Sequence, residues 1–479
     1  MQNNPSIKKN YILNLAYQVL AVCVPIITTP YVSRILMADG IGAYSYTLSI
    51  ATYFSMFAAL GISTYGQLEI SKHRDSCQQR SKLFFEIIAA RLFMAALMLI
   101  IYALLSKPLG TYQILYRIMA IYIVADTIDI SWFFQGLEEF RVIVLRSCVI
   151  KVLSTLCIFI FVKQKDDLAL YALILQGSAL TGNILLWPYL KNYLCRIDLH
   201  KIRFYRHWKD SLVYFIPTVA TSVYTVLDKS MIGFFTKSSL QNGYYEQAHK
   251  IEQILLVFLT SLGTVTLPRL VYLWKNGDKN SLNKIMDRTI SFILLISFPM
   301  MFGISAVADK LIPLFLGDGY EECIVLLRIF SVLLVIVGLD NIIGKQCLVA
   351  TGRQKQFNIG VILGAIVNFM ANLFLINRFG AKGAAVGSVV AEITILSTFI
   401  YFSKNIYDFS NLKYSFIKYG IAGAIMGIIT WIVGTHLSVT VIGLLIQIII
   451  GMIVYFLILT ISKDPIINAV FVKIKQDRN

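Results

Sequence analysis

Charged side chains occur inside stretches that are otherwise apolar, and these are the residues most able to do chemistry. An ionisable group at mid-membrane depth costs at least about 2.5 to 3.5 kcal/mol on insertion scales, so it normally faces a cavity or a partner. As a set, these residues predict a polar path through an apolar protein. They are Arg91, Asp126, Asp129, Lys151, Asp228, Lys229, Glu252, Arg269, Arg328, Asp340 and Glu392.

Two of these carboxylates, Asp126 and Asp129, are three residues apart. On one helix that spacing sets both toward the same face, where a proton or a sodium ion could be held between them. An equally good interpretation is a structural hydrogen-bonded pair with Arg117 or Arg91. We predict no cofactor, only coupling to an H⁺ or Na⁺ gradient, for which Asp228 and Glu392 are further candidate residues.

Cysteine and histidine give no sign of a metal centre. None of the seven cysteines forms a CxxC pair, and the five histidines are scattered along the chain. A zinc site would need several of them at ligand spacing. We therefore expect neither a metal site nor a disulfide framework.

The elements that must position these charges are membrane-spanning helices. The chain of 479 residues is 57% hydrophobic and 14% charged, whereas about a quarter of a soluble protein is charged. A spanning helix needs roughly 20 apolar residues, and such runs recur along the chain. We predict an all-α integral membrane protein with about fourteen spans: 11–32, 41–65, 83–105, 113–134, 142–162, 168–190, 211–235, 250–274, 289–312, 322–343, 357–377, 383–403, 417–435 and 439–461.

The positive charges predict the orientation of these helices. The net charge is +17, and 28 of the 43 lysines and arginines fall on one side of the predicted membrane against nine on the other. Because positive loops stay inside, both termini are predicted to be cytoplasmic. The basic residues are spread through short loops, so we expect no nucleic-acid partner.

A weak internal repeat divides the chain. Gly42-Ala43-Tyr44 follows the first predicted span, and Gly243-Tyr244-Tyr245 follows the seventh. Both spans begin on the same side, so the halves would be related by a pseudo-two-fold axis along the membrane normal. We predict two six-helix lobes and two additional helices with a cytoplasmic tail, over residues 1–210, 211–403 and 404–479.

Several runs of sequence resemble the polysaccharide transporter family, the Wzx-like flippases of the multidrug/oligosaccharidyl-lipid/polysaccharide exporter superfamily. They lie in both halves of the chain. The matching runs include Thr28-Thr29-Pro30-Tyr31-Val32-Ser33-Arg34, Gly40-Ile41-Gly42-Ala43-Tyr44, Asp129-Ile130-Ser131-Trp132-Phe133-Phe134-Gln135-Gly136, Gly243-Tyr244-Tyr245-Glu246-Gln247 and Asn341-Ile342-Ile343-Gly344-Lys345-Gln346.

The resemblance implies two lobes around a cationic lumen and no enzymatic activity. Such a protein moves undecaprenyl-diphosphate-linked oligosaccharide across the bacterial cytoplasmic membrane by alternating access, for capsule, O-antigen or a related polysaccharide. Polysaccharide polymerase and chain-length machinery are its implied protein partners. The segment Tyr65-Gly66-Gln67-Leu68-Glu69 departs from the family pattern, which has an Asn-Arg pair before the glutamate.

Substrate-binding residues follow from the matching motifs and from the intramembrane arginines. Arginine forks and lysine point charges suit a diphosphate. The candidates are Arg34, Arg91, Gln135, Lys229, Glu246 and Arg328.

Two other functions compete with this interpretation. A multidrug cation antiporter of the same superfamily would require an acidic cavity, because buried charge selects the opposite sign. An integral-membrane polysaccharide polymerase would present a sizeable catalytic loop. The predicted loops are too short to favour the polymerase.

Overall fold

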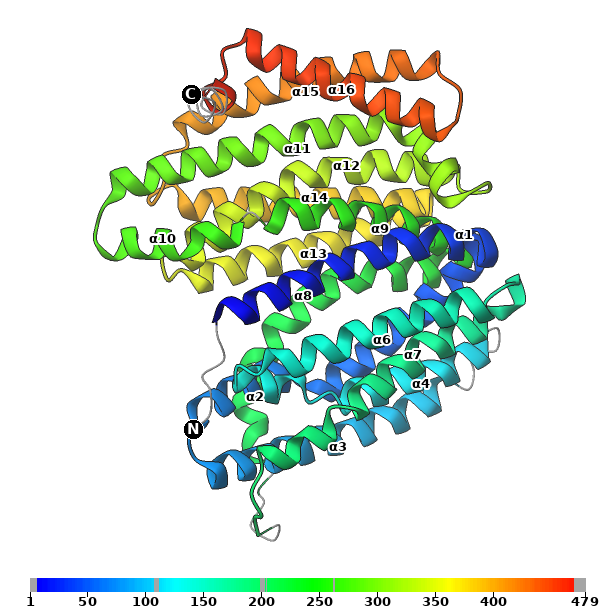
Figure 1. The fold of residues 1–479 in the computed structure, drawn as a ribbon, viewed down its shortest axis with the longest axis vertical. Coiled ribbons are helices and arrows are strands. Elements are labelled where there is room, and N and C mark those ends of the chain that lie inside the picture. Colours follow the sequence, from blue (N-terminus) through cyan, green and yellow to red (C-terminus); the bar gives the residue numbers. More distant parts are fainter. Residues whose placement is uncertain (1–6, 107–111, 199–202, 204, 262, 469–479) are drawn as a thin grey trace. The chain divides into compact units, whose positions relative to one another are not determined.

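The computed structural model is helical, and it has no strand within residues 7–106, 112–198, 203, 205–261 and 263–468, which are the residues that it describes (Figure 1). Its α-helices are α1 Ile7–Ala59, α2 Ile62–Lys72, α3 Cys77–Ser106, α4 Gln113–Thr127, α5 Ser131–Gly136, α6 Phe140–Phe161, α7 Leu168–Ile184, α8 Arg206–Thr236, α9 Ser239–Ser261, α10 Gly263–Lys275, α11 Lys279–Leu316, α12 Glu322–Asp340, α13 Gln354–Phe379, α14 Ala381–Ser403, α15 Ser410–Thr435 and α16 Val441–Ile461. Short 3₁₀ helices, η2 and η3, cover Lys165–Asp167 and Trp187–Asn192, and a π-helix, η5, covers Asn341–Val349.

The apolar helices confirm the membrane class. Ten helical stretches within the described residues are long and apolar enough to cross a bilayer. Each of the fourteen predicted spans overlaps one helix or two consecutive helices, and the first two overlap the single apolar stretch Val19–Lys72. The number fourteen stays a prediction.

Several predicted spans are interrupted. The chain kinks at Met37, whose φ is 56°, between the predicted spans 11–32 and 41–65, and the span 41–65 breaks at a turn where Leu60 and Gly61 both have positive φ. The predicted span 113–134 breaks after Thr127, and α5 begins only at Ser131. Such breaks leave helix-end carbonyls without intrahelical partners, so other groups must satisfy them.

The chain forms two compact units, Met1–Gly243 and Tyr244–Asn479. In the first, α1 packs against α3, α4 and α6, and α4 packs against α7. The first unit includes α8, because α8 contacts α1, α2 and α3. In the sequence, the boundary between the units therefore lies after the predicted boundary at residue 210. The division based on the repeat stays a prediction.

In the second unit α11 is the central helix, and it contacts α10, α12, α15 and α16. Helices α13 and α14 form an extensively packed pair, which joins α12 through α14. The π-helix follows α12 without a break and is close-packed on α14, since a Cβ on Gly344 would collide with the ring of Phe399. π-helical segments inside α-helices are frequently found at functional sites.

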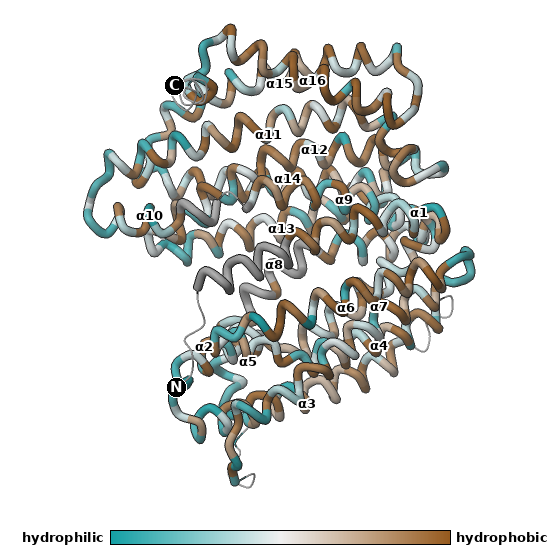
Figure 2. The backbone as a smooth tube through the Cα atoms, viewed as in Figure 1, coloured by the Kyte–Doolittle hydropathy of each residue, from teal (hydrophilic) through white to brown (hydrophobic). Residues whose placement is uncertain are grey.

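Side-chain polarity follows the helix bodies and their ends. Figure 2 shows hydrophobic residues along α15 and α16 and hydrophilic residues in the turn between α10 and α11. Large apolar side chains on these helices are exposed, for example Ile442 at 71% and Ile461 at 80%. Exposed apolar surface of this kind is stable only against lipid or another apolar partner.

Candidate functional site

The break between α4 and α5 in the first unit is built around Arg91. Arg91 lies on α3 and is 1% exposed. Its Nη1 donates to the Asp129 carbonyl oxygen at 2.9 Å, and its Nη2 donates to the Asp126 carbonyl oxygen at 2.6 Å. The same Nη2 lies 3.3 Å from Asp126 Oδ2. One guanidinium thus satisfies two carbonyls that the break exposes and also pairs with a carboxylate.

Asp126 and Asp129 do not share a helix face, so that expectation from their spacing was wrong. Helix α4 ends at Thr127, and Asp129 lies in the turn that follows. Asp126 Oδ2 accepts from Ser55 Oγ at 2.6 Å, whereas Asp129 Oδ1 accepts from the Ser131 backbone nitrogen at 2.8 Å. Asp129 also accepts from the Ser131 hydroxyl and so supports the start of α5. These contacts favour the interpretation as structural carboxylates, with Arg91 as the basic partner.

A second layer of polar contacts holds the same break. Arg146 of α6 donates to Asn183 Oδ1 at 2.6 Å and to Ser131 Oγ at 3.2 Å. Asn183 Nδ2 donates to the Ala125 carbonyl oxygen at 2.7 Å, and Trp187 Nε1 donates to the Ile128 carbonyl oxygen at 3.0 Å. The break is therefore fixed by side chains from α3, α6, α7 and η3.

The other predicted residues of the first unit lie on α1, α5 and α8. Arg34 is exposed, and its Nη1 lies 3.4 Å from the Pro30 carbonyl oxygen. Asp228 is 3% exposed and Lys229 is half-buried. Gln135 is half-buried on the short helix α5. Arg34 and Lys229 are thus the candidate cations of this unit with the greater access to a ligand.

A polar seam joins α1 to α8 next to Asp228. Ser230 Oγ donates to Ser49 Oγ at 2.9 Å, and both side chains are buried. Tyr53 of α1 lies near Ser230 and Asp228. Hydroxyl groups thus connect the two helices that carry Arg34 and Lys229.

The remaining predicted residues lie in the second unit. Glu246 Oε1 lies 3.5 Å from Lys250 Nζ one turn along α9. Arg328 Nη2 lies 2.6 Å from Asp309 Oδ2, and its Nε donates to the Ser305 carbonyl oxygen at 3.2 Å. Arg328 therefore joins α12 to α11, and a role in substrate binding stays a prediction.

An acidic group lies inside the second unit. Glu252 of α9, Asp340 of α12 and Glu392 of α14 are 2%, 7% and 7% exposed. Glu392 is close enough to both Asp340 and Glu252 to interact electrostatically. Neither carboxyl oxygen of Asp340 makes a hydrogen bond of ordinary geometry within the described part of the chain. Our choice of ion-coupling residues included Glu392 but missed Asp340, because only the fold brings α12 and α14 together.

An apolar cavity of about 500 Å³ also lies in the second unit. Side chains from α9, α11, α15 and α16 line it, including Leu255, Pro299, Met426, Met452 and Phe456. Its lining is almost entirely apolar, so it suits a hydrocarbon chain better than a sugar or a drug cation.

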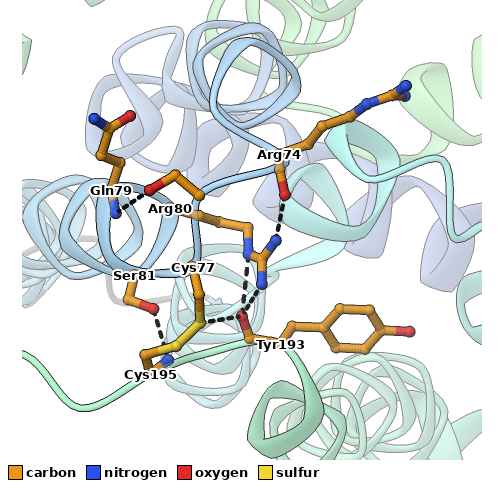
Figure 3. The surroundings of a disulfide bond; sticks show 8 residues. Arg74, Cys77, Gln79, Arg80, Ser81, Tyr193 and Cys195 are labelled. Carbon is orange, nitrogen blue, oxygen red and sulfur yellow. Dashed lines mark hydrogen bonds between the residues drawn. A yellow bond between two sulfur atoms is a disulfide. The ribbon is translucent and has the colours of Figure 1, made fainter. Parts of the chain in front are cut away.

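The expectation about disulfides was wrong at one pair. Cys77 and Cys195 are bonded to each other, with their Cα atoms 5.9 Å apart (Figure 3). They are separated by 118 residues, and no local spacing rule reports so distant a partner. Among the described residues, no group of three or more His, Cys, Asp or Glu side chains could hold a metal ion.

Buried charge networks inside a bundle of apolar helices define a polytopic membrane protein. Its fold is similar to the folds of solved transport proteins. A solved structure of the lipid II flippase MurJ in an inward closed conformation matches with a TM-score of 0.77 and 15% identity, over 96% of this chain and 99% of that one. A multidrug transporter of the MATE family in an inward-facing conformation matches with a TM-score of 0.59 and 14% identity, over 80% and 98% of the two chains.

The chain belongs to the polysaccharide biosynthesis protein family, whose model matches residues 7–274. A candidate O-antigen transporter of Escherichia coli (strain K12) is 23% identical over 411 residues, which are 84% of this chain and 98% of that protein. The capsular polysaccharide biosynthesis protein CapF of Staphylococcus aureus is 21% identical over 410 residues, or 83% and 100% of the two chains. The family that the sequence resemblance indicated is therefore confirmed.

Proposed function

We propose that the protein is a flippase that moves undecaprenyl-diphosphate-linked oligosaccharide across the cytoplasmic membrane for the synthesis of a surface polysaccharide. The observation that carries the proposal is that both the O-antigen and the capsule relatives align over almost their whole lengths. The flippase fold supports it, although a fold alone does not fix a substrate. Relatives named as an O-antigen transporter and as a glycan biosynthesis flippase support a transporter rather than an enzyme.

The diphosphate would be bound by Arg34 and Lys229. Both side chains lie in the first unit. The side chain of Arg34 is exposed, and that of Lys229 is half-buried. A diphosphate offers several anionic oxygens to a guanidinium fork and an ammonium group. Replacing both by Gln should impair glycan export and leave folding largely intact. Normal export by the double Gln variant would remove the two residues from the binding site.

The lipid part of the substrate would use apolar surface. The cavity between α9, α11, α15 and α16 could take a segment of the polyprenyl chain, since its lining is hydrocarbon. Met452→Asp would place a charge on this lining. We expect the variant to slow transport of the polyprenyl substrate more than transport of a short-chain analogue.

Ion coupling would be carried by the acidic group of the second unit. Two carboxylates that meet away from water repel each other, and one proton between Asp340 and Glu392 relieves the repulsion. Transport in proteoliposomes should then depend on an imposed proton gradient. Asp340→Asn should abolish the dependence, whereas Asp309→Asn, at a half-exposed carboxylate, should keep it. Full gradient dependence in the Asp340→Asn variant would exclude this coupling site.

The test of the function compares two substrates in one preparation. Purified protein in proteoliposomes should flip an undecaprenyl-diphosphate-linked oligosaccharide and should not export a cationic dye. A cation antiporter is the second candidate, because the buried acidic side chains of the second unit could bind an organic cation as well as a proton. Dye export without flipping would overturn the proposal in favour of that candidate.

The proposed setting is the cytoplasmic membrane of a bacterium, with both termini in the cytoplasm. The distribution of basic residues supports this orientation. Rapid labelling, from outside intact cells, of a cysteine introduced at Lys191 would overturn it. Polysaccharide polymerase and chain-length proteins are the proposed partners in the pathway, and crosslinking in cells would detect them.

A further inference from the structure

The pair Cys77 and Cys195 ties the start of α3 to the segment that leads toward α8. Cys77 is the first residue of α3, and Cys195 follows the 3₁₀ helix Trp187–Asn192 (Figure 3). Their Cα separation of 5.9 Å lies within the range that a disulfide requires, about 4.4 to 6.8 Å.

Hydrogen bonds hold the two sulfur atoms near each other independently of the bond. Arg80 Nε and Nη2 donate to the Tyr193 carbonyl oxygen at 3.0 and 2.6 Å, and Arg80 Nη1 donates to the Arg74 carbonyl oxygen at 2.5 Å. The Cys195 backbone nitrogen donates to Ser81 Oγ at 2.8 Å. Reduction would therefore leave the thiols close together, and the bond could form again without a search through other conformations.

The first turn of α8 is anchored on the same helices. His207 Nε2 lies 2.9 Å from Glu86 Oε2 of α3, and His207 Nδ1 lies 2.7 Å from the Tyr65 hydroxyl oxygen of α2. Glu86 Oε1 accepts from the Arg203 backbone nitrogen at 3.1 Å. All three side chains of this group are buried. Two sets of contacts thus hold the chain near the start of α8. One is the hydrogen-bonded group of His207, Glu86 and Tyr65, and the other is the Cys77–Cys195 disulfide.

We propose that Cys77 and Cys195 are a reversible oxidation site that takes a small-molecule disulfide and, when bonded, restrains α8. One cysteine thiolate attacks the small disulfide, forms a mixed disulfide and releases one small thiol. The other cysteine thiolate then attacks the mixed disulfide at the protein sulfur and releases the second small thiol. The two protein thiols lose two electrons and two protons, which the small disulfide receives.

Cys77 is the thiol that attacks first. It begins α3, where the helix dipole favours negative charge. The segments that carry both cysteines are predicted to face the cytoplasm, where thiols are kept reduced. The bond is therefore open in growing cells and closes under oxidative stress.

The consequence for transport rests on the proposed flippase function. Helix α8 carries Asp228 and Lys229 and contacts α1, α2 and α3, so it has to shift if these helices rearrange during transport. The bonded form keeps Cys195, which precedes α8 in the chain, fixed on α3. We expect oxidation to slow flipping by about tenfold, a change of about 1.4 kcal/mol in the barrier.

The experiment uses the full-length protein in proteoliposomes, treated with oxidised glutathione and then with dithiothreitol. Peptide mass spectrometry should find the 77–195 bond after oxidation, and hydrogen exchange over residues 205–215 should slow. Flipping should fall and then recover on reduction. The variants Cys77→Ser and Cys195→Ser should lose all three responses, whereas the double variant Cys148→Ser/Cys157→Ser, altered only on α6, should keep them.

Two results would overturn the switch. Maleimide labelling of Cys77 and Cys195 that is as complete after oxidation as before would exclude the oxidation site. Unchanged flipping and unchanged exchange in the bonded protein would exclude the restraint on α8. If the reduced protein flips no lipid-linked oligosaccharide at all, the proposed function fails, and the labelling and exchange measurements still decide the switch.

Discussion

The backbones of Gly42 in α1 and Gly243 in α9 pack directly against each other. A Cβ atom on Gly42 would be 2.6 Å from the Gly243 backbone nitrogen and would overlap the Ser239 carbonyl oxygen. A Cβ atom on Gly243 would overlap the Ala38 carbonyl oxygen. These are the first glycines of the two repeated motifs, so the sequence pattern marked a pair of positions where two backbones touch.

The close approach predicts that Gly42→Ala destabilises the protein. The added methyl group forces α1 and the start of α9 apart, and overpacking of this kind typically costs about 1 to 3 kcal/mol. Gly177→Ala on α7 is the matched control, because a Cβ there meets nothing within 4 Å. In detergent, the melting temperature should fall for the first variant and stay the same or rise for the second. Equal effects would refute the packing argument.

Hydropathy and charge predicted much of the fold, because long apolar runs and basic loops are local properties of the chain. The breaks were harder to predict. Nothing in the run 113–134 distinguishes an unbroken helix from α4 and α5, because both are apolar and the stabilising group, Arg91, comes from another helix. Tertiary partners of this kind do not appear in any sequence window.

Two of the Arg–Asp pairs, Arg91–Asp126 and Arg328–Asp309, should differ sharply in energetic importance. Arg91 is buried and bonded to two carbonyl oxygens and a carboxylate, so Arg91→Gln should cost about 3 kcal/mol or more. Arg328 and Asp309 are 36% and 51% exposed, and Arg328→Gln should cost about 1 kcal/mol or less. Thermal unfolding of both variants in one detergent measures the difference. A larger loss for Arg328→Gln would contradict this assignment.

Asp126 and Asp129 should contribute differently to stability, because their side chains have different partners. Asp126→Asn removes the negative charge beside Arg91 and should lower stability by about 1 to 2 kcal/mol. Asp129→Asn keeps an oxygen that can accept from the Ser131 backbone nitrogen, and asparagine side chains form turns of this kind as aspartate side chains do. Its effect should be a few tenths of a kcal/mol. Both variants should keep the gradient dependence of transport, and its loss in the double Asn variant would restore the coupling role predicted from the spacing.

The candidate site was only partly predictable for a related reason. Intramembrane charge singled out Arg91, Asp228 and Glu392, since each violates the apolar pattern by itself. The buried group of Glu86, His207 and Tyr65 could not be found in this way. The sequence predicts His207 to lie in a loop, and Tyr65 lies in the segment that departs from the family pattern. Their buried hydrogen-bonded group with Glu86 forms only in the folded chain.

Asp464, just beyond α16, should make stability depend on pH. It is fully buried, and Lys418 forms an ion pair with its Oδ2, to which the Tyr419 hydroxyl donates at 2.9 Å. Burial alone would raise its pKa, but the hydrogen bonds from Lys418, the Ile467 backbone nitrogen and Tyr419 outweigh burial and hold the pKa below the ordinary value of 3.8. A carboxylate with a depressed pKa stabilises the fold above its unfolded-state pKa and loses this contribution as the pH falls through the folded-state pKa.

The variant Asp464→Asn should therefore be less stable than the native protein by about 3 kcal/mol at neutral pH, because it leaves Lys418 without its buried partner. The gap in melting temperature should stay constant from pH 7 down to about pH 4 and shrink below it, since protonation then removes the same charge from the native protein. Lys418→Met provides the control. Without the ammonium group the pKa of Asp464 should rise, and the loss of stability on acidification should begin at a higher pH. A gap between native and Asn proteins that widens on acidification would show that Asp464 does not act as an ionised partner of Lys418.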